Sequence, residues 1–218
     1  MFLNLTIILR KDYIRPALLR YKMRVLLLDN YDSFTYTLAD YLQQAGADCV
    51  VRRNTVPLTT ITAQPYDAVV LSPGPGVPAS AGCLLSVVDY YHNRLPMLGV
   101  CLGQQAIGTY FGATLQKSHR PMHGKVSTIR VDVTDPLFQH VPDRIRVTRY
   151  HSLTLSKLPP ILTTLATTES VADGATLVGG EIMAIRHQSL PVWGVQFHPE
   201  AVLTQSGLTI LRNFITAK

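Results

Sequence analysis

The chain has 218 residues, of which 47% are hydrophobic and 16% are charged, a balance typical of one globular domain rather than of a disordered chain. No apolar run reaches the roughly 18 residues that a membrane-spanning helix needs, so we expect no membrane partner. The net charge is +6, but residues 1–22 carry +4 of it and the rest of the chain has no basic stripe with interleaved aromatic residues, so we expect no nucleic-acid partner.

Residues 1–22 are interpreted as an N-terminal extension, and residues 23–218 as the single folded domain. The apolar part of the extension is short, and neither a basic stretch before it nor a small-residue cleavage motif after it indicates a signal peptide. Two explanations stay open. Either the extension is an arm that binds a partner or weakly contacts a membrane, or the start is assigned too early and Met23 is the first residue, because "MRVLLLDNYDSF" begins as a domain does.

The N-terminal half of the domain alternates strand-like and helix-like segments. Short apolar runs that end in polar residues predict buried parallel strands, and apolar residues at helical spacing predict helices. The expected strands cover 24–29, 48–54, 96–100 and the start of 66–76, and the expected helices cover 33–44, 82–94 and 102–110. This alternation predicts an α/β fold with an open, mostly parallel, doubly wound sheet and flanking helices.

The C-terminal half changes pattern at about residue 124. Short β-branched segments interrupted by Pro and Gly continue to about residue 184 and predict a small antiparallel sheet. A further strand within 191–200 ends in a polar turn, and a helix over 207–215 closes the chain. Because ligands of doubly wound sheets sit beyond the carboxyl ends of the strands, we expect one edge to bring together the loops at 29–33, 72–76 and Cys101.

The stretch from Gly99 to Gly103 has the form G-x-C-x-G, with Cys101 between an expected strand and an expected helix. It is the cysteine counterpart of the nucleophile elbow, in which the glycines remove Cβ atoms where the turn crowds the backbone. The free N–H groups at the start of the helix favour a thiolate. A small buried core cysteine is the alternative that this stretch alone leaves open. Cys49 and Cys83 have no such context and are interpreted as packing residues.

A cysteine nucleophile needs a base, and the base needs an orienting group. His198 and Glu200 stand two positions apart at the end of an expected strand, with Pro199 stiffening the turn between them. The carboxylate would fix the imidazole tautomer and stabilise the imidazolium. The pattern H-x-E is weak evidence by itself. Among the other histidines, His151 is the best further candidate.

Ser72 to Gly76, "SPGPG", is a proline-braced glycine loop after an expected strand. We expect its backbone N–H groups to face a developing oxyanion together with the N–H of Leu102. An ordinary turn is the alternative. The loop lacks the GK[ST] ending of a phosphate-binding loop.

The chain contains three cysteines, an odd number without paired spacing. This favours a reducing compartment, and we expect a cytoplasmic protein. No Cys-x-x-Cys pair or Cys/His cluster has the spacing of zinc ligands, so we expect neither a metal nor a cofactor.

Together these segments resemble the class I glutamine amidotransferases, and most closely the small glutaminase subunits of anthranilate synthase and of aminodeoxychorismate synthase. The resemblance covers Met23 to about Lys218 and implies a flavodoxin-like, doubly wound fold. The matching pieces, in chain order, are "LLLDNYDSFTYTLADYL", "VVLSPGPGVP", "PMLGVCLGQQAIG", "MHGK", "RYHSL" and "VWGVQFHPE".

The resemblance also implies roles for individual residues. Cys101 would attack the side-chain amide of L-glutamine, and His198, oriented by Glu200, would take the thiol proton and pass it to the departing ammonia. The oxyanion would be held by the N–H groups of Gly74 and Leu102. The residues that would hold the glutamine are Gly74, Pro75, Gly76, Gln105, Ser152 and Leu153.

The ammonia would pass to a larger, chorismate-binding synthase subunit in a heteromer, and the loops at 30–33 and 122–125 would face that partner. The partner would decide between tryptophan and folate synthesis. Two alternatives are a stand-alone Cys-His-Glu hydrolase, such as a γ-glutamyl peptidase on a related fold, and a non-catalytic module. The partner-facing motifs argue against the first and the intact triad argues against the second. The family commonly continues with serine after the glutamate, where this chain has Ala201; we expect only a small effect.

Overall fold

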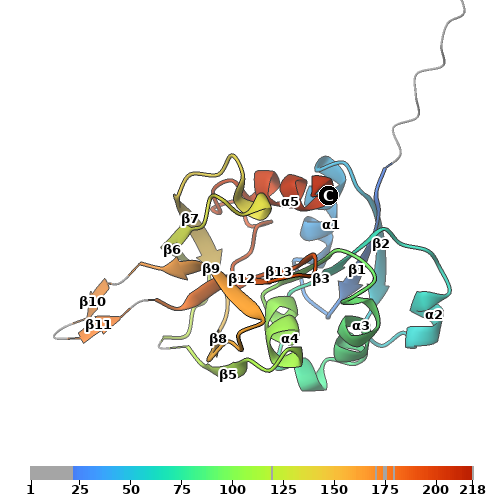
Figure 1. Cartoon of the computed structure of the whole chain (residues 1–218), viewed down its shortest axis with the longest axis horizontal. Coiled ribbons are helices and arrows are strands. Elements are labelled where there is room, and N and C mark those ends of the chain that lie inside the picture. Colours follow the sequence, from blue (N-terminus) through green and yellow to red (C-terminus); the bar gives the residue numbers. More distant parts are fainter. Residues whose placement is uncertain (1–21, 119, 170, 174–175, 179, 218) are drawn as a thin grey trace, which may run out of the picture.

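The computed structural model describes residues 22–118, 120–169, 171–173, 176–178 and 180–217 (Figure 1). All of the predicted N-terminal extension except Lys22 lies outside the described residues, so the division into residues 1–22 and 23–218 stays a prediction. The described part of the chain is built on a nine-stranded sheet with the strand order β2-β1-β3-β4-β13-β12-β9-β6-β7.

Five neighbouring strands are parallel and form one side of this sheet, from the edge strand β2 inwards. They are β2 (Asp48–Arg53), β1 (Arg24–Asp29), β3 (Ala68–Leu71), β4 (Met97–Val100) and β13 (Val192–Val195). Every residue of β3, β4 and β13 is buried, as is usual for parallel strands covered on both faces. The predicted α/β fold with a mostly parallel, doubly wound sheet is confirmed.

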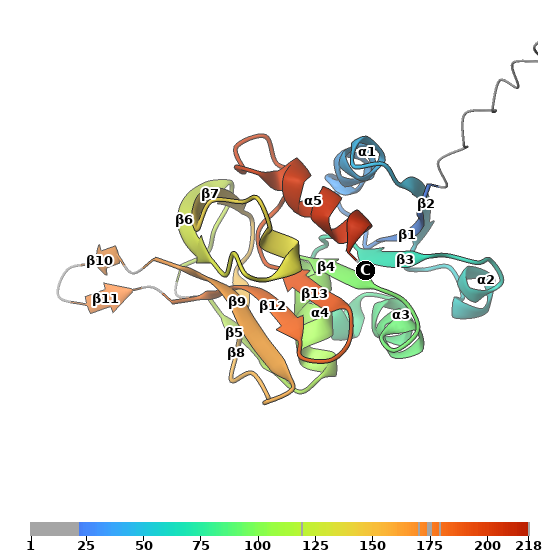
Figure 2. The same ribbon diagram turned by 45° about the horizontal axis from the view of Figure 1, so that its top comes forward.

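Helices cover both faces of the parallel strands, as Figure 2 shows. Two of them share one hydrophobic core: α1 (Thr35–Gln44) and α5 (Gly207–Thr216). The opposite core is filled by α2 (Leu58–Thr62), α3 (Leu84–Tyr91) and α4 (Leu102–Tyr110). None of the described helices is long and apolar enough to cross a membrane.

The predicted antiparallel strands are present, and most of them extend the main sheet. β13 joins the two halves, because it pairs in parallel with β4 on one side and antiparallel with β12 on the other. The antiparallel part consists of β12 (Ile182–His187), β9 (Leu162–Thr168), β6 (Lys125–Val131) and β7 (Arg144–Arg149). Two small antiparallel sheets stand apart: β5 (Thr114–Lys117) with β8 (Leu153–Ser156), and β10 (Val171–Asp173) with β11 (Thr176–Val178).

A few elements differ from the sequence-based expectation. The helix expected over 82–94 starts only at Leu84, because Gly82 has a φ of +55° and the N–H of Cys83 donates to the carbonyl of Asn54. The sequence did not reveal α2, a helix of only five residues, or β5, whose residues are largely exposed and show no apolar alternation. Short elements of this kind carry too few apolar residues for a periodic signal.

Candidate active site

Cys101 lies on a sharp turn between β4 and α4. Its backbone has a φ of +53° and a ψ of −103°, a conformation that residues other than glycine rarely adopt. The turn is held by two backbone hydrogen bonds: the N–H of Cys101 donates to the carbonyl of Val195 over 2.8 Å, and its carbonyl accepts from the N–H of Gln105 over 3.1 Å. The predicted strand–elbow–helix arrangement is therefore present.

The two glycines of the elbow allow β4 and α4 to approach closely. A Cβ atom on Gly99 would lie 2.3 Å from the carbonyl carbon of Gly103, and a Cβ on Gly103 would lie 2.4 Å from the carbonyl oxygen of Leu71. Both contacts are with backbone atoms, which cannot rotate away. The spacing G-x-C-x-G is thus a packing requirement of this turn.

The other two cysteines are packing residues, as predicted. Cys49 and Cys83 are partly buried against the two hydrophobic cores. Burial raises the pKa of Cys49 to about 11 and also raises the pKa of Cys83. Both side chains are therefore held as neutral thiols.

His198 and Glu200 form a buried pair on the turn that follows β13. The Nδ1 atom of His198 lies 2.7 Å from Oε1 of Glu200, and the side chains are 2% and 0% exposed. The backbone of His198 is fixed as well, because its N–H donates to the carbonyl of Thr148 and its carbonyl accepts from the hydroxyl of Thr204. The imidazole is thereby held in one position, with Nδ1 directed at the carboxylate.

The charge state of His198 follows from its neighbours. Burial, the largest single influence, lowers the pKa of His198, but the side chains of Cys101 and Glu200 together outweigh it and hold this pKa well above its ordinary value of 6.5. Nδ1 is occupied by Glu200, while Nε2 is buried without a hydrogen-bond partner among the described residues. The geometry thus leaves Nε2 for proton exchange with the cysteine sulfur.

Two aromatic rings enclose the imidazole. The rings of Phe34 and Tyr150 contact that of His198 edge-on, with centroid distances of 5.5 and 5.0 Å, and lie 5.0 Å from each other. Together with Glu200, these packed rings restrict the orientation of the imidazole. The sequence did not reveal this contact, although Phe34 lies in the stretch "DNYDSF" and Tyr150 in the stretch "RYHSL".

The loop at 72–76 lies against the first turn of α4, as predicted. A Cβ on Gly74 would come within 2.7 Å of the Leu102 side chain and within 2.6 Å of Asn30. Asn30 fastens the loop: its N–H donates to Oγ of Ser72 over 2.8 Å, and its Nδ2 donates to the Ser72 carbonyl over 2.9 Å. Asn54 in turn donates to Oδ1 of Asn30. The structure therefore brings Gly74 and Leu102 together, with the backbone of the loop fixed in place.

Apart from Gly74, which lies against Leu102, the residues predicted to hold glutamine divide into two groups. Gln105 and Leu153 are brought together, because Nε2 of Gln105 donates to the Leu153 carbonyl over 3.1 Å. Pro75, Gly76 and Ser152 are exposed, and they take no part in this hydrogen bond. Only the first group is tied to the buried residues around Cys101.

His151 is placed so that it cannot serve as a second base. Its Nδ1 lies 2.9 Å from the Leu153 carbonyl, and its Nε2 accepts a hydrogen bond from Nε of Arg149 over 3.1 Å. Burial, followed by the charge of Arg149, lowers the pKa of His151 to about 4. His151 is therefore a neutral residue that fixes a carbonyl group.

Known proteins are similar to this chain in both sequence and fold. The family model "Glutamine amidotransferase class-I" matches residues 26–217. The chain belongs to the class I glutamine amidotransferases.

Relatives of this class I amidotransferase include synthase components. Component 2 of the pyocyanine-specific anthranilate synthase of Pseudomonas aeruginosa is 43% identical over 195 residues, covering 88% of this chain and 92% of the relative. The aminodeoxychorismate/anthranilate synthase component 2 of Bacillus subtilis is 42% identical over 194 residues, covering 88% and 95%. Among solved structures, a putative GMP synthase subunit from Thermoplasma acidophilum matches with a TM-score of 0.76 and 27% identity, covering 89% of this chain and 93% of that one.

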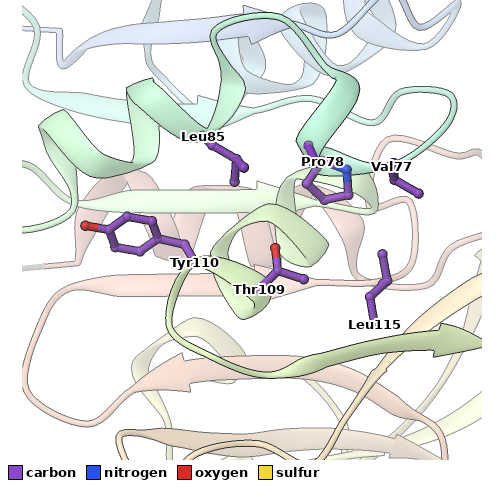
Figure 3. A pocket seen from close by; sticks show the side chains of 7 residues that line it. Val77, Pro78, Leu85, Thr109, Tyr110 and Leu115 are labelled. Atoms are coloured by element: carbon purple, nitrogen blue, oxygen red, sulfur yellow. The ribbon is translucent and has the colours of Figure 1, made fainter.

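This class I amidotransferase also has an apolar cavity of about 220 Å³ away from the triad (Figure 3). It lies between α3, α4 and β5 and is lined by Val77, Pro78, Ala79, Leu85, Thr109, Tyr110 and Leu115. Thr109 and Tyr110 end α4, whereas Cys101 precedes it, and a helix rises 1.5 Å per residue, so roughly 12 Å of helix lie between this wall of the cavity and Cys101. Another wall, Val77 to Ala79, directly follows the loop at 72–76.

Proposed function

We propose that this chain is the glutaminase subunit of anthranilate synthase or of aminodeoxychorismate synthase. It hydrolyses L-glutamine to glutamate and ammonia and supplies the ammonia to the synthase. The observation that carries this proposal is the buried His198–Glu200 pair, 2.7 Å apart, next to Cys101 on its elbow. This geometry occurs in a chain whose relatives of 42–43% identity are named as component 2 of these synthases.

In the proposed reaction the Cys101 thiolate attacks the side-chain amide carbon of glutamine. The negative charge moves to the amide oxygen, which accepts hydrogen bonds from the backbone N–H groups of Gly74 and Leu102. The His198 imidazolium gives a proton to the amide nitrogen, the C–N bond breaks, and ammonia leaves a glutamyl thioester. His198, now neutral, takes a proton from water as it attacks the thioester, and glutamate departs from the restored Cys101.

Glutamine is held in this proposal by Gln105, Leu153, Ser152 and the loop from Gly74 to Gly76. The partly buried hydrogen bond between Gln105 and Leu153 supports the assignment of these two, because it fixes polar groups close to the proposed nucleophile. The roles of Pro75, Gly76 and Ser152 rest on the matching sequence motifs alone.

The proposed partner is a larger synthase subunit that binds chorismate, the component 1 that the name component 2 presupposes. Large apolar side chains are exposed on segments that adjoin the triad in sequence or in space, as expected of a partner surface. They are Tyr31, Tyr36, Tyr150, Val202 and Leu203. The loops at 30–33 and 122–125 belong to the same proposed surface. A cytoplasmic location is part of the proposal, supported by the three free thiols.

The test is glutamine hydrolysis by the purified chain, alone and with anthranilate synthase component 1 or aminodeoxychorismate synthase component 1. We expect low activity alone, stimulation by one or both partners, and near-complete loss in Cys101→Ser. The aromatic product formed with each partner identifies the pathway. Hydrolysis of γ-glutamyl peptides at a rate that no partner changes would instead support a stand-alone γ-glutamyl peptidase, and activity retained by Cys101→Ser would remove the nucleophile from the proposal.

A further inference from the structure

Gln196 is a fully buried residue between β13 and the turn that carries His198. Its Nε2 atom lies 3.5 Å from the sulfur of Cys101, within the range of hydrogen bonds to sulfur. Its Oε1 atom accepts a hydrogen bond of 3.2 Å from Nε2 of Gln105. None of the proposed catalytic or binding roles uses this side chain, although it touches the reacting atom.

The direction of each hydrogen bond around Gln196 follows from one carbonyl group. The Leu153 carbonyl can only accept, so Gln105 must turn its Nε2 toward it, over 3.1 Å. The second hydrogen of the same Nε2 then points to Gln196, which must offer its oxygen. This leaves the Nε2 of Gln196 facing Cys101, so that the sulfur faces an N–H donor and not the amide oxygen.

The Leu153 carbonyl also accepts a second hydrogen bond. Nδ1 of His151 donates to it over 2.9 Å, and Nε2 of His151 accepts from Arg149. Arg149 is itself paired with Glu181. The chain of hydrogen bonds that ends at the sulfur thus begins at a buried ion pair, and each member has one possible orientation.

We propose that Gln196 donates a hydrogen bond to the Cys101 sulfur, stabilises its thiolate and holds it in the direction of attack. The inference rests on the proposed function, because it takes Cys101 as the nucleophile. A hydrogen bond given to the charged form of an acceptor favours that form, and the effect is larger where water is excluded. Cys101 is 7% exposed and Gln196 is 0% exposed, so water does not compete for this contact.

The test measures the reactivity of the thiol itself. Wild type, Gln196→Met and the control Gln104→Met are alkylated with iodoacetamide at neutral pH, and modification of the Cys101 peptide is followed by mass spectrometry, which separates it from Cys49 and Cys83. Gln104 is a matched control: it is 0% exposed, and neither polar atom of its side chain has a hydrogen-bond partner in the described part of the chain. We expect Gln196→Met to slow alkylation about tenfold, as loss of a hydrogen bond to a charged group implies, and Gln104→Met to leave the rate unchanged.

A second variant separates the hydrogen bond from packing. Gln196→Glu keeps the shape of the side chain but places a carboxylate oxygen where the donor stood, so we expect a slower alkylation than in Gln196→Met. Circular dichroism confirms that each variant is folded. Wild-type alkylation rates in both folded variants, or equal slowing in Gln104→Met, would overturn the inference.

Turnover with the synthase partner gives an independent readout. We expect Gln196→Met to lower kcat and to leave KM close to the wild-type value, because the contact is with the nucleophile rather than with glutamine. A change confined to KM contradicts the inference. The proposed function and this inference fail separately: a wild-type chain that never hydrolyses glutamine refutes the former, and variants with wild-type thiol reactivity refute the latter.

Discussion

The substitution Glu200→Gln isolates the electrostatic part of the proposed triad. Glutamine keeps an oxygen that can accept the Nδ1–H of His198 and loses only the charge. Since the two side chains are 2% and 0% exposed, solvent screening does not weaken their interaction. A hydrogen bond to a charged group is about twice as strong as a neutral one, so the variant loses about 1 to 1.5 kcal/mol. Since 1.4 kcal/mol is a factor of ten, we expect kcat to fall roughly 5- to 12-fold.

The same substitution also changes the titration of His198. Glu200 is one of the two groups that hold the pKa of His198 above 6.5 against the opposing effect of burial, so this pKa falls in the variant. A raised folded-state pKa contributes stability that is present below 6.5 and lost as the pH rises through the folded value. The variant lacks this contribution, and its deficit in unfolding free energy is therefore largest at neutral and acid pH and shrinks in alkali.

The assays are glutaminase kinetics with the synthase partner, histidine NMR titration, and urea denaturation across this pH range. Glu200→Asp serves as the control that keeps the charge and shortens the side chain. A Glu200→Gln enzyme with kcat within about threefold of the wild type, or an unchanged titration of His198, would refute the electrostatic reasoning.

Three further substitutions test the support of the site. Gly103→Ala places a Cβ 2.4 Å from a backbone oxygen of β3, so we expect a loss of about 1 to 3 kcal/mol in urea denaturation together with lower activity. Arg149→Met removes the ion-pair partner of Glu181, which still accepts from Oγ of Ser118, and denaturation is expected to show a loss of about 1 to 3 kcal/mol. Asn30→Ala keeps the backbone hydrogen bond to Oγ of Ser72 but removes the one from Nδ2 to the Ser72 carbonyl and the acceptor of Asn54 Nδ2. Kinetics are expected to show kcat falling about tenfold, since the loop loses its side-chain support.

The sequence supports prediction best where a local pattern and a strand end coincide. The elbow at Cys101 and the turn at His198 each follow a short apolar strand, and the alternation of strands and helices places both at the carboxyl edge of one sheet. The structure explains the glycines of the elbow: a Cβ on Gly99 would collide with backbone atoms of Gly103, and a Cβ on Gly103 with those of Leu71. These features are local, so the sequence alone revealed them.

Contacts that depend on strand order could not be predicted in this way. Gln196 touches Cys101 because β13 lies beside β4, although 95 positions separate the two residues. The enclosure of His198 by Phe34 and Tyr150 joins three distant segments. Likewise, the sequences of the antiparallel strands did not predict that these strands continue the main sheet, because the alternation of apolar residues in a strand does not specify which strand pairs with it.

The position of β13 also has a consequence for folding. The proposed nucleophile follows β4 and the proposed base follows β13, and these strands meet only after β13 has entered the sheet between β4 and β12. Until then Cys101 has neither His198 nor Gln196 beside it. In the proposed function, the activated nucleophile therefore arises only together with the native strand order.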